Sequence, residues 1–171
     1  QTVVQVNTLR ISAEELAERL NREHVCARPH EWMADCLVLS GTGSLEQLPA
    51  FREGLFYVQD PAAKLSVLCA GLPESGGNVL DCCAAPGGKT SQLAAALQGQ
   101  GLLLANEFVA ARAEILRQNL ERMGVTNAVI TNEDTARLAA AMPGQFDRVL
   151  VDAPARARVC SARSRRRRPA Q

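Results

Sequence analysis

The chain has 171 residues, of which 47% are hydrophobic and 4% aromatic, and this is enough for the core of one domain of ordinary size. The composition excludes a chain that is disordered as a whole, and the lack of an apolar run of about 20 residues or of a signal peptide argues against membrane and secreted proteins. The six cysteines form no CxxC pair, which argues against zinc ribbons and disulfide frameworks, so we expect a cytoplasmic protein with reduced thiols and no metal.

The net charge of +1 hides a difference between the two parts of the chain. Residues 1–154 carry 12 Lys and Arg against 18 Asp and Glu, whereas residues 155–171 carry seven Arg and no acid. Gln1 stands where an initiator methionine would be expected. We therefore expect a piece of a longer chain, in which residues 155–171 form a separate and disordered tail.

Residues 1–60 are predicted to form part of a small α+β module and a linker. The β-branched run Val3–Ile11 predicts a strand. Ser12 followed by Glu15 is a capping-box pattern that begins a short helix ending near Arg22. Weaker signals predict a strand over 36–39, one or two helical turns over 45–51 and a β-like segment over 54–60.

Residues 61–154 show a more regular order. Asp60 and Pro61 suit the N-cap and first turn of a helix over 62–70. Beyond it, strands are predicted over 79–82, 102–105, 127–131 and 146–151, and helices over 90–97, 109–123 and 135–141. Strands that alternate with helices in this way indicate an α/β domain with a parallel sheet covered on both faces.

Polar residues follow the four predicted strands of this sheet, where ligands of open α/β sheets bind. The first strand leads into the small-residue loop Cys83–Lys89, which allows a close approach of backbone to ligand before a helix N-terminus. Glu107 follows the second strand and suits the two hydroxyls of a ribose. Asp134 follows the third strand, where it could accept from an adenine amino group, and Asp152 follows the fourth.

Each of these features also has a simpler interpretation. The glycine turn could be geometry alone, and Glu107 could be a solvated acid. Asp134 could simply cap the helix that begins at Thr135. The occurrence of all four features at strand ends favours a binding site, whereas Cys82 and Cys83 are expected to pack in the core because no basic residue next to them in the sequence would activate them.

Two other nucleotide motifs fit the loop poorly. Lys89 and Thr90 match the end of a Walker loop, but Cys83 stands where its first glycine belongs. The segment also lacks the G-x-G-x-x-G pattern of dinucleotide-binding proteins. A ligand with adenine and ribose but no pyrophosphate fits better, and S-adenosylmethionine is a common ligand of that kind.

Four segments together resemble the bacterial RNA (cytosine-5) methyltransferases, specifically the RsmF-type enzymes of 16S rRNA. They are 81–90 (DCCAAPGGKT), 105–107 (ANE), 131–134 (TNED) and 151–154 (VDAP). The resemblance covers residues 3–154 and implies the Rossmann-like fold of S-adenosylmethionine-dependent methyltransferases with a truncated sheet, an RNA-facing module over 1–60, and a monomer that binds rRNA. The positions that it implies for cofactor binding are Cys83, Ala84, Ala85, Pro86, Gly87, Gly88, Lys89, Glu107, Asp134 and Asp152.

The resemblance also implies how such enzymes methylate cytosine. A cysteine thiolate adds to carbon 6, which makes carbon 5 able to attack the methyl group of the cofactor. The family carries one cysteine directly after the Asp-Ala-Pro segment and another on a later strand. Here Ala155 stands at the first position and the second segment is absent. We therefore leave the catalytic residues unassigned and expect this chain to be inactive.

Residues Ala155–Ser164 suggest why the motif stops. With suitable synonymous codons, one added base converts this segment into Cys-Ser-Gly-Glu-Gly-Met-Phe-Arg-Lys-Glu, which resembles the family's continuation and includes its cysteine. We hypothesise the loss of one nucleotide near codon 154.

Two other functions remain open at this point. One is an NAD(P)-dependent oxidoreductase built on a similar sheet. The other is a non-enzymatic RNA-binding fragment, in which the arginines of 163–168 attract phosphate.

Overall fold

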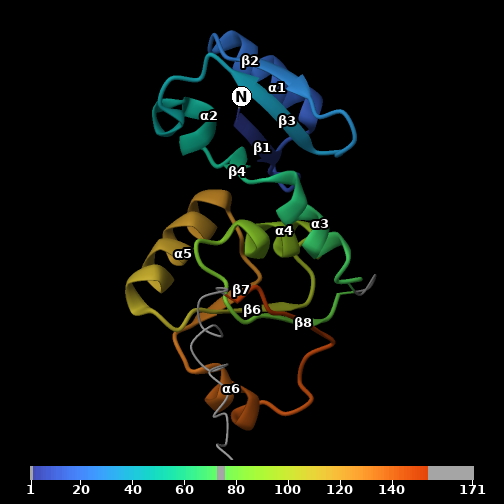
Figure 1. Ribbon diagram of the computed structural model, residues 1–171, viewed down its shortest axis with the longest axis vertical. Coiled ribbons are helices and arrows are strands. Elements are labelled where there is room, and N and C mark those ends of the chain that lie inside the picture. Colours follow the sequence, from blue (N-terminus) through green and yellow to red (C-terminus); the bar gives the residue numbers. More distant parts are fainter. Residues whose placement is uncertain (1, 73–75, 154–171) are drawn as a thin grey trace, which may run out of the picture.

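Two four-stranded sheets follow one another along the chain in the computed structural model, which describes residues 2–72 and 76–153 (Figure 1). The first region contains, in chain order, β1 (Thr2–Val6), α1 (Ala13–Arg22), β2 (Cys26–Pro29), β3 (Cys36–Ser40), a 3-10 helix (Leu45–Gln47), α2 (Pro49–Arg52) and β4 (Phe56–Val58). Its strands are antiparallel in the order β2-β3-β1-β4. This arrangement gives the α+β module that the sequence predicts.

Helix α1 supplies much of the core of this first region. Ser12 accepts a hydrogen bond from the Glu15 backbone while the Glu15 side chain accepts one from the Ser12 backbone, so the predicted capping box is confirmed. Leu16 and Leu20 on the apolar face of the helix are completely buried against the sheet, and Ala13 and Ala17 are partly buried. The core consists of Val4, Val6, Leu16, Leu20, Val25, Leu37, Leu39, Ala50 and Phe56.

The first region differs from the sequence prediction in two places. The strand expected over Val3–Ile11 ends at Val6, because the buried Asn7 turns the chain there and its carbonyl accepts from the Arg10 and Ile11 backbones. Strand β2 was not predicted. Its mostly exposed residues lack an alternating pattern, and it forms by pairing with β3.

The second region contains the alternating elements that the sequence predicts. They are α3 (Pro61–Leu68), β5 (Asn78–Asp81), α4 (Gly88–Ala96), β6 (Leu102–Asn106), α5 (Ala110–Met123), β7 (Ala128–Thr131), α6 (Thr135–Ala141) and β8 (Arg148–Leu150). The strands are all parallel in the order β7-β6-β5-β8. The predicted parallel α/β sheet is therefore confirmed.

Helices cover both faces of this second sheet (Figure 1). Val79 and Leu103 point to the face covered by α3 and α4, while Leu80 and Leu104 point to the face that packs against Leu138 of α6. Successive strand residues thus alternate between two apolar cores, as expected for a buried parallel sheet.

Polar side chains connect the two regions at the end of α5. The Asn7 amide nitrogen donates to the carbonyls of Gly54 and Met123, both at 2.8 Å. The Arg122 guanidinium lies 4.0 Å from the centre of the Phe51 ring and donates to the Phe51 carbonyl at 2.7 Å. Burial lowers the pKa of Arg122. These contacts fix the end of α5 against the first region.

Strand β8 is the last described strand and lies at an edge of the described sheet. Val149 and Val151 are 52% and 63% exposed, so apolar side chains are accessible at this edge. Ala155 and the tail 155–171 lie outside the described residues. Within the described ranges, none of the helices has the length and apolarity that a membrane crossing requires.

Candidate functional site

The loop between β5 and α4 depends on two glycines. Gly87 has a φ of 109°, a conformation that favours glycine, and it directly precedes the first turn of α4. A Cβ atom on Gly88 would lie only 2.7 Å from Cε1 of Tyr57. The absence of a side chain therefore lets β4 of the first region approach the N-terminus of α4, whose backbone N–H groups suit an anion.

Hydrogen bonds from polar side chains hold this loop in place. The Thr90 hydroxyl donates to Asp81 Oδ2 at 2.8 Å, and the Asn119 amide donates to the Pro86 carbonyl at 2.9 Å. Asp81 is almost completely buried, and this burial raises the pKa of its carboxyl group. The loop is thus supported by α5 as well as by its own helix.

Asn106, at the end of β6, connects three strand ends. Its amide nitrogen donates to the Glu133 carbonyl at 3.0 Å, and its oxygen accepts from the Thr131 hydroxyl at 2.9 Å. The Asn106 carbonyl accepts from the Ala84 backbone at 2.9 Å. The sequence indicated a strand end here but not this role.

Glu107 is buried, with only 3% of its surface exposed. One carboxylate oxygen accepts from the Val109 backbone at 3.0 Å, whereas Oε2 has no hydrogen-bond partner within the described ranges. Oε2 lies 3.7 Å from Arg112, which donates to the Ala85 carbonyl at 2.9 Å. Arg112 therefore links the Glu107 carboxylate to the loop, and one carboxylate oxygen accepts no hydrogen bond.

Lys89 and Asp152, 63 positions apart in the chain, form an ion pair of 2.7 Å between Nζ and Oδ2. Lys89 is on the first turn of α4, and Asp152 follows β8. The parallel sheet brings the two strand ends together, so these two predicted site residues are in direct contact.

Asp134 has the simpler role that the sequence left open. Its carboxylate accepts from the Ala136 backbone at 2.7 Å and caps α6. Its part in cofactor binding stays a prediction.

The thiols of Cys82 and Cys83 are poorly suited to attack. Burial is the main cause of a raised pKa at both, to about 11 for Cys82. No basic residue is next to them in the sequence, but in the fold the positive charge of Arg112 acts on Cys83. Its effect is outweighed by burial and by the neighbouring carboxylates, so neither cysteine is an activated nucleophile.

A cavity of about 230 Å³ lies between this loop and the first region. Tyr57 and Gln59 line it from β4 and the segment after it, and Gln59 Oε1 is buried without a hydrogen-bond partner in the described part of the chain. The other lining residues are Val58, Ala63, Cys83, Ala84, Ala85, Pro86, Gly88, Lys89 and Asp152. Glu107 and Asp134 do not line this cavity, so the cavity does not bring all the predicted residues together.

Sequence reasoning missed the contributions of Tyr57, Gln59, Arg112 and Phe108. Phe108 is 68% exposed directly after Glu107 and offers an open aromatic face. The described residues contain no group of three His, Cys, Asp or Glu side chains that could hold a metal ion. The arrangement supplies helix N–H groups, an acceptor carboxylate and a hydrophobic ring, which suit a polar nucleoside-like ligand.

Comparisons with known proteins identify several relatives. A sequence model of the family described as 16S rRNA methyltransferase RsmB/F matches residues 69–170. The "Ribosomal RNA small subunit methyltransferase F" proteins of Vibrio parahaemolyticus and Vibrio campbellii are 37% and 39% identical over 155 residues, which is 88% of this chain. This chain spans only about a third, 32%, of the length of each.

Solved structures agree on the fold. A "methyltransferase homolog protein" from Pyrococcus horikoshii superposes with a TM-score of 0.78 and 32% identity over 89% of this chain and 50% of that one. NSun6 from Pyrococcus horikoshii, solved with SFG, gives a TM-score of 0.80 and 20% identity over 90% of this chain and 62% of that one. The predicted Rossmann-like methyltransferase fold is confirmed, and these relatives give no support to the NAD(P)-dependent alternative.

Proposed function

Because the chain belongs to the 16S rRNA methyltransferase RsmB/F family, we propose that it is the cofactor-binding part of an S-adenosylmethionine-dependent rRNA methyltransferase. The observation that carries the proposal is the spare oxygen of Glu107. A buried carboxylate oxygen that has an ion-pair contact at 3.7 Å but no hydrogen bond is costly, and a ribose hydroxyl would supply that hydrogen bond. Its position at the end of β6 is the one where acids of such sheets accept from ribose hydroxyls.

The residues that would hold the cofactor are Glu107, the loop Cys83–Lys89, Asp134 and Asp152. When bound, S-adenosylmethionine supplies an electrophilic methyl group on a positively charged sulfur. Gly87 and Gly88 let the backbone of this chain approach a ligand closely. Asp152 places a negative charge at the wall of the cavity, and Lys89 offsets part of it at 2.7 Å.

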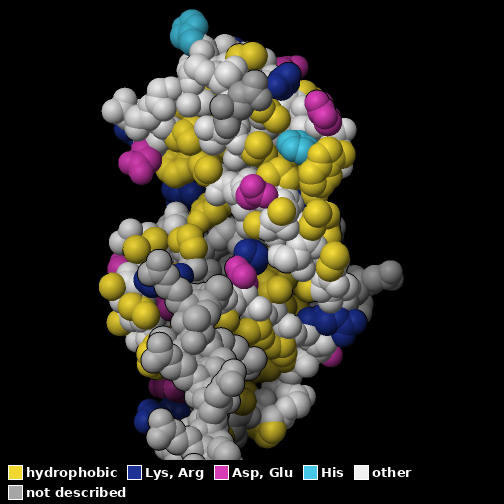
Figure 2. Space-filling model, in the orientation of Figure 1, with side chains coloured by type: hydrophobic (Ala, Val, Ile, Leu, Met, Phe, Trp, Pro, Cys, Tyr) yellow, Lys and Arg dark blue, Asp and Glu magenta, His cyan; other side chains and the backbone are white. Residues whose placement is uncertain are grey.

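The substrate of the proposed reaction is carbon 5 of a cytosine in 16S rRNA, and residues 1–60 are proposed to face the RNA in the cytoplasm. Figure 2 shows basic and acidic side chains interspersed on the visible face that is not grey, with no single basic patch.

Turnover is not expected from the chain as printed. Ala155 offers no thiol, and it lies outside the described residues. Cys82 and Cys83 do not replace the missing nucleophile, because burial raises the pKa of both thiols. Binding without methylation is the expected behaviour.

Calorimetry with S-adenosylmethionine tests cofactor binding. We expect Glu107→Gln to weaken S-adenosylmethionine binding about tenfold or more, because a neutral amide accepts hydrogen bonds from the two ribose hydroxyls less well than a carboxylate does. Glu46→Gln, an exposed acid on the 3-10 helix, is the matched control and should leave the affinity unchanged. Binding of NAD(P) in place of S-adenosylmethionine would refute the proposal.

A second experiment tests the reaction. The encoding DNA is resequenced across codons 150–171, and the frame-corrected chain, with Cys in place of Ala155, is incubated with labelled S-adenosylmethionine and small ribosomal subunits. Label recovered as 5-methylcytidine from the corrected chain, and none from the printed chain, is the expected result. Label in another nucleoside would overturn the assignment to cytosine.

A further inference from the structure

The only tryptophan of the chain lies in the turn between β2 and β3, residues 30–35. Trp32 is 61% exposed, and its ring makes an edge contact with the ring of His30, with 5.0 Å between the ring centres and 81° between the ring planes. Two rings at this angle do not stack face to face, so at least one face of the indole is left free of His30. Covering that face would remove a large apolar surface from water, which makes the ring a contact surface for another flat group.

The turn that carries Trp32 is held at several points. The His30 backbone donates to the Cys36 carbonyl at 2.9 Å, and a backbone N–H of β1 donates to the Asp35 carbonyl at 2.8 Å. Met33, the next residue after Trp32, is only 6% exposed. Since these contacts order the turn in the free protein, a ligand that covers the indole has less conformational entropy to overcome.

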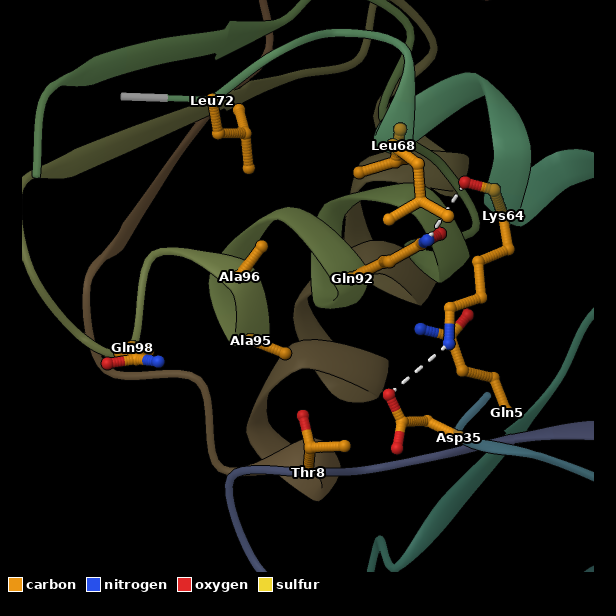
Figure 3. A pocket seen from close by; sticks show the side chains of 11 residues that line it. Gln5, Thr8, Asp35, Lys64, Leu68, Leu72, Gln92, Ala95, Ala96 and Gln98 are labelled. Atoms are coloured by element: carbon orange, nitrogen blue, oxygen red, sulfur yellow. Dashed lines mark hydrogen bonds and ion pairs between the residues drawn. The ribbon is translucent and has the colours of Figure 1, made fainter. Parts of the chain in front are cut away.

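Helix α3 of the second region holds the end of the same turn (Figure 3). The Lys64 ammonium donates to the Ala34 carbonyl at 2.6 Å and lies 3.7 Å from Asp35 Oδ2. Ala63, the residue before Lys64, lines the cavity of about 230 Å³ in the candidate site. Helix α3 therefore contacts both the turn and this cavity, so a single RNA strand can contact both.

We propose that Trp32 stacks on a base of the RNA strand, near the nucleotide that is methylated. The inference rests on the proposed rRNA methyltransferase function and adds a base contact on the first region. Proteins bind unpaired RNA bases by stacking them on aromatic side chains, and every base has a face that can stack. Glu31, next to Trp32 in the sequence, repels phosphate, so the contact is with the base and not with the backbone.

Tryptophan fluorescence of the unmodified chain tests this contact, because Trp32 is the only source of the signal. The full chain is titrated with a single-stranded RNA that has one cytosine among purines, and with a matched strand that has abasic sites in place of the purines. We expect the RNA to quench the fluorescence and to bind about tenfold more tightly than the abasic strand, which keeps the phosphates but has few bases to stack. A tryptophan signal that stays unchanged throughout the titration, or equal affinity for the two strands, would overturn the proposal.

Variants separate stacking from a structural role. Trp32→Ala should weaken the binding of dye-labelled RNA about tenfold in fluorescence anisotropy, whereas Trp32→Phe keeps a flat ring and should weaken it less than about threefold. Val129→Ala, which shortens a 49% exposed side chain on β7, is the control and should leave the RNA affinity unchanged. The dependence of affinity on salt concentration should be the same in Trp32→Ala as in the unmodified chain, because no phosphate contact is lost. A weaker salt dependence, or equal losses for the alanine and phenylalanine variants, would overturn the proposal.

Calorimetry with S-adenosylmethionine keeps this inference separate from the proposed function. Trp32→Ala should bind the cofactor as tightly as the unmodified chain, because Trp32 is not among the residues that line the candidate cavity. Cofactor binding without any effect of RNA on Trp32 would refute the stacking alone. Stacking without cofactor binding would instead refute the proposed cofactor site.

Discussion

The two regions of the molecule bury different kinds of side chain. The first region, residues 2–58, encloses one continuous apolar core in which Leu16, Leu37 and Phe56 have no exposed surface. The second region divides its apolar residues among smaller clusters on the two faces of a parallel sheet. It also buries carboxylates at the ends of β5 and β6, Asp81 and Glu107.

This difference separates stability from binding. The first region gains stability from complete apolar burial. In the second region, the desolvation of the buried acidic groups at the strand ends offsets part of the stability gained from apolar burial. A buried carboxylate oxygen without a hydrogen bond, such as Glu107 Oε2, is unfavourable in the free protein and becomes useful when a ligand donates to it. The comparison predicts that core substitutions act on unfolding and strand-end substitutions act on binding.

The largest expected effect is on the first core. Phe56→Ala should lower the free energy of unfolding by about 3–5 kcal/mol, because it removes a fully buried ring and leaves a cavity. Urea denaturation followed by circular dichroism measures this. The exposed Val149→Ala in β8 is the control and should change it by less than about 0.5 kcal/mol. Equal losses of unfolding free energy in the two variants would contradict the proposed difference between the two regions.

Two helix caps give a smaller and sharper test. Ser12→Ala and Asp134→Ala each remove a side-chain cap, from α1 and α6, and each should cost about 1 kcal/mol in the same unfolding measurement. Asp134→Ala should in addition weaken S-adenosylmethionine binding in calorimetry, whereas Ser12→Ala should not. If both variants bind the cofactor equally well, Asp134 is a cap alone.

The smallest effect is on the pH dependence of stability. Burial raises the pKa of Asp81 above its ordinary value of 3.8, so the folded chain holds this proton more tightly than the unfolded chain does. Stability from this group is therefore present below the ordinary pKa and is lost as the pH rises through the folded pKa. Asp81→Asn should flatten the fall in stability above pH 3.8, measured by urea denaturation at several pH values. An unchanged slope would show that Asp81 does not titrate in that range.

Local signals explain which parts of the fold could be predicted. The capping box at Ser12, the Asp60 cap of α3 and the left-handed Gly124 after α5 depend only on neighbouring residues, and all three are present. Strand β2 has no strand-like sequence pattern and forms by pairing with β3, so it could not be predicted.

The same division applies to the site. The positions of Glu107 and Asp152 follow from strand ends, which hydrophobic patterns reveal. Arg112 and Tyr57 reach the loop from another helix and from the other sheet, so their contribution depends on tertiary packing that no local pattern records.

The two hydrogen bonds of the Asn7 amide set an order for folding during synthesis. Its first acceptor, the Gly54 carbonyl, leaves the ribosome 69 residues before the second, the Met123 carbonyl. At about 5–20 residues per second, this interval lasts roughly 3 to 14 s. The first sheet therefore has time to form around its own core before α5 is synthesised. The N–H of Asn7 that later donates to the Met123 carbonyl can bind water during this interval.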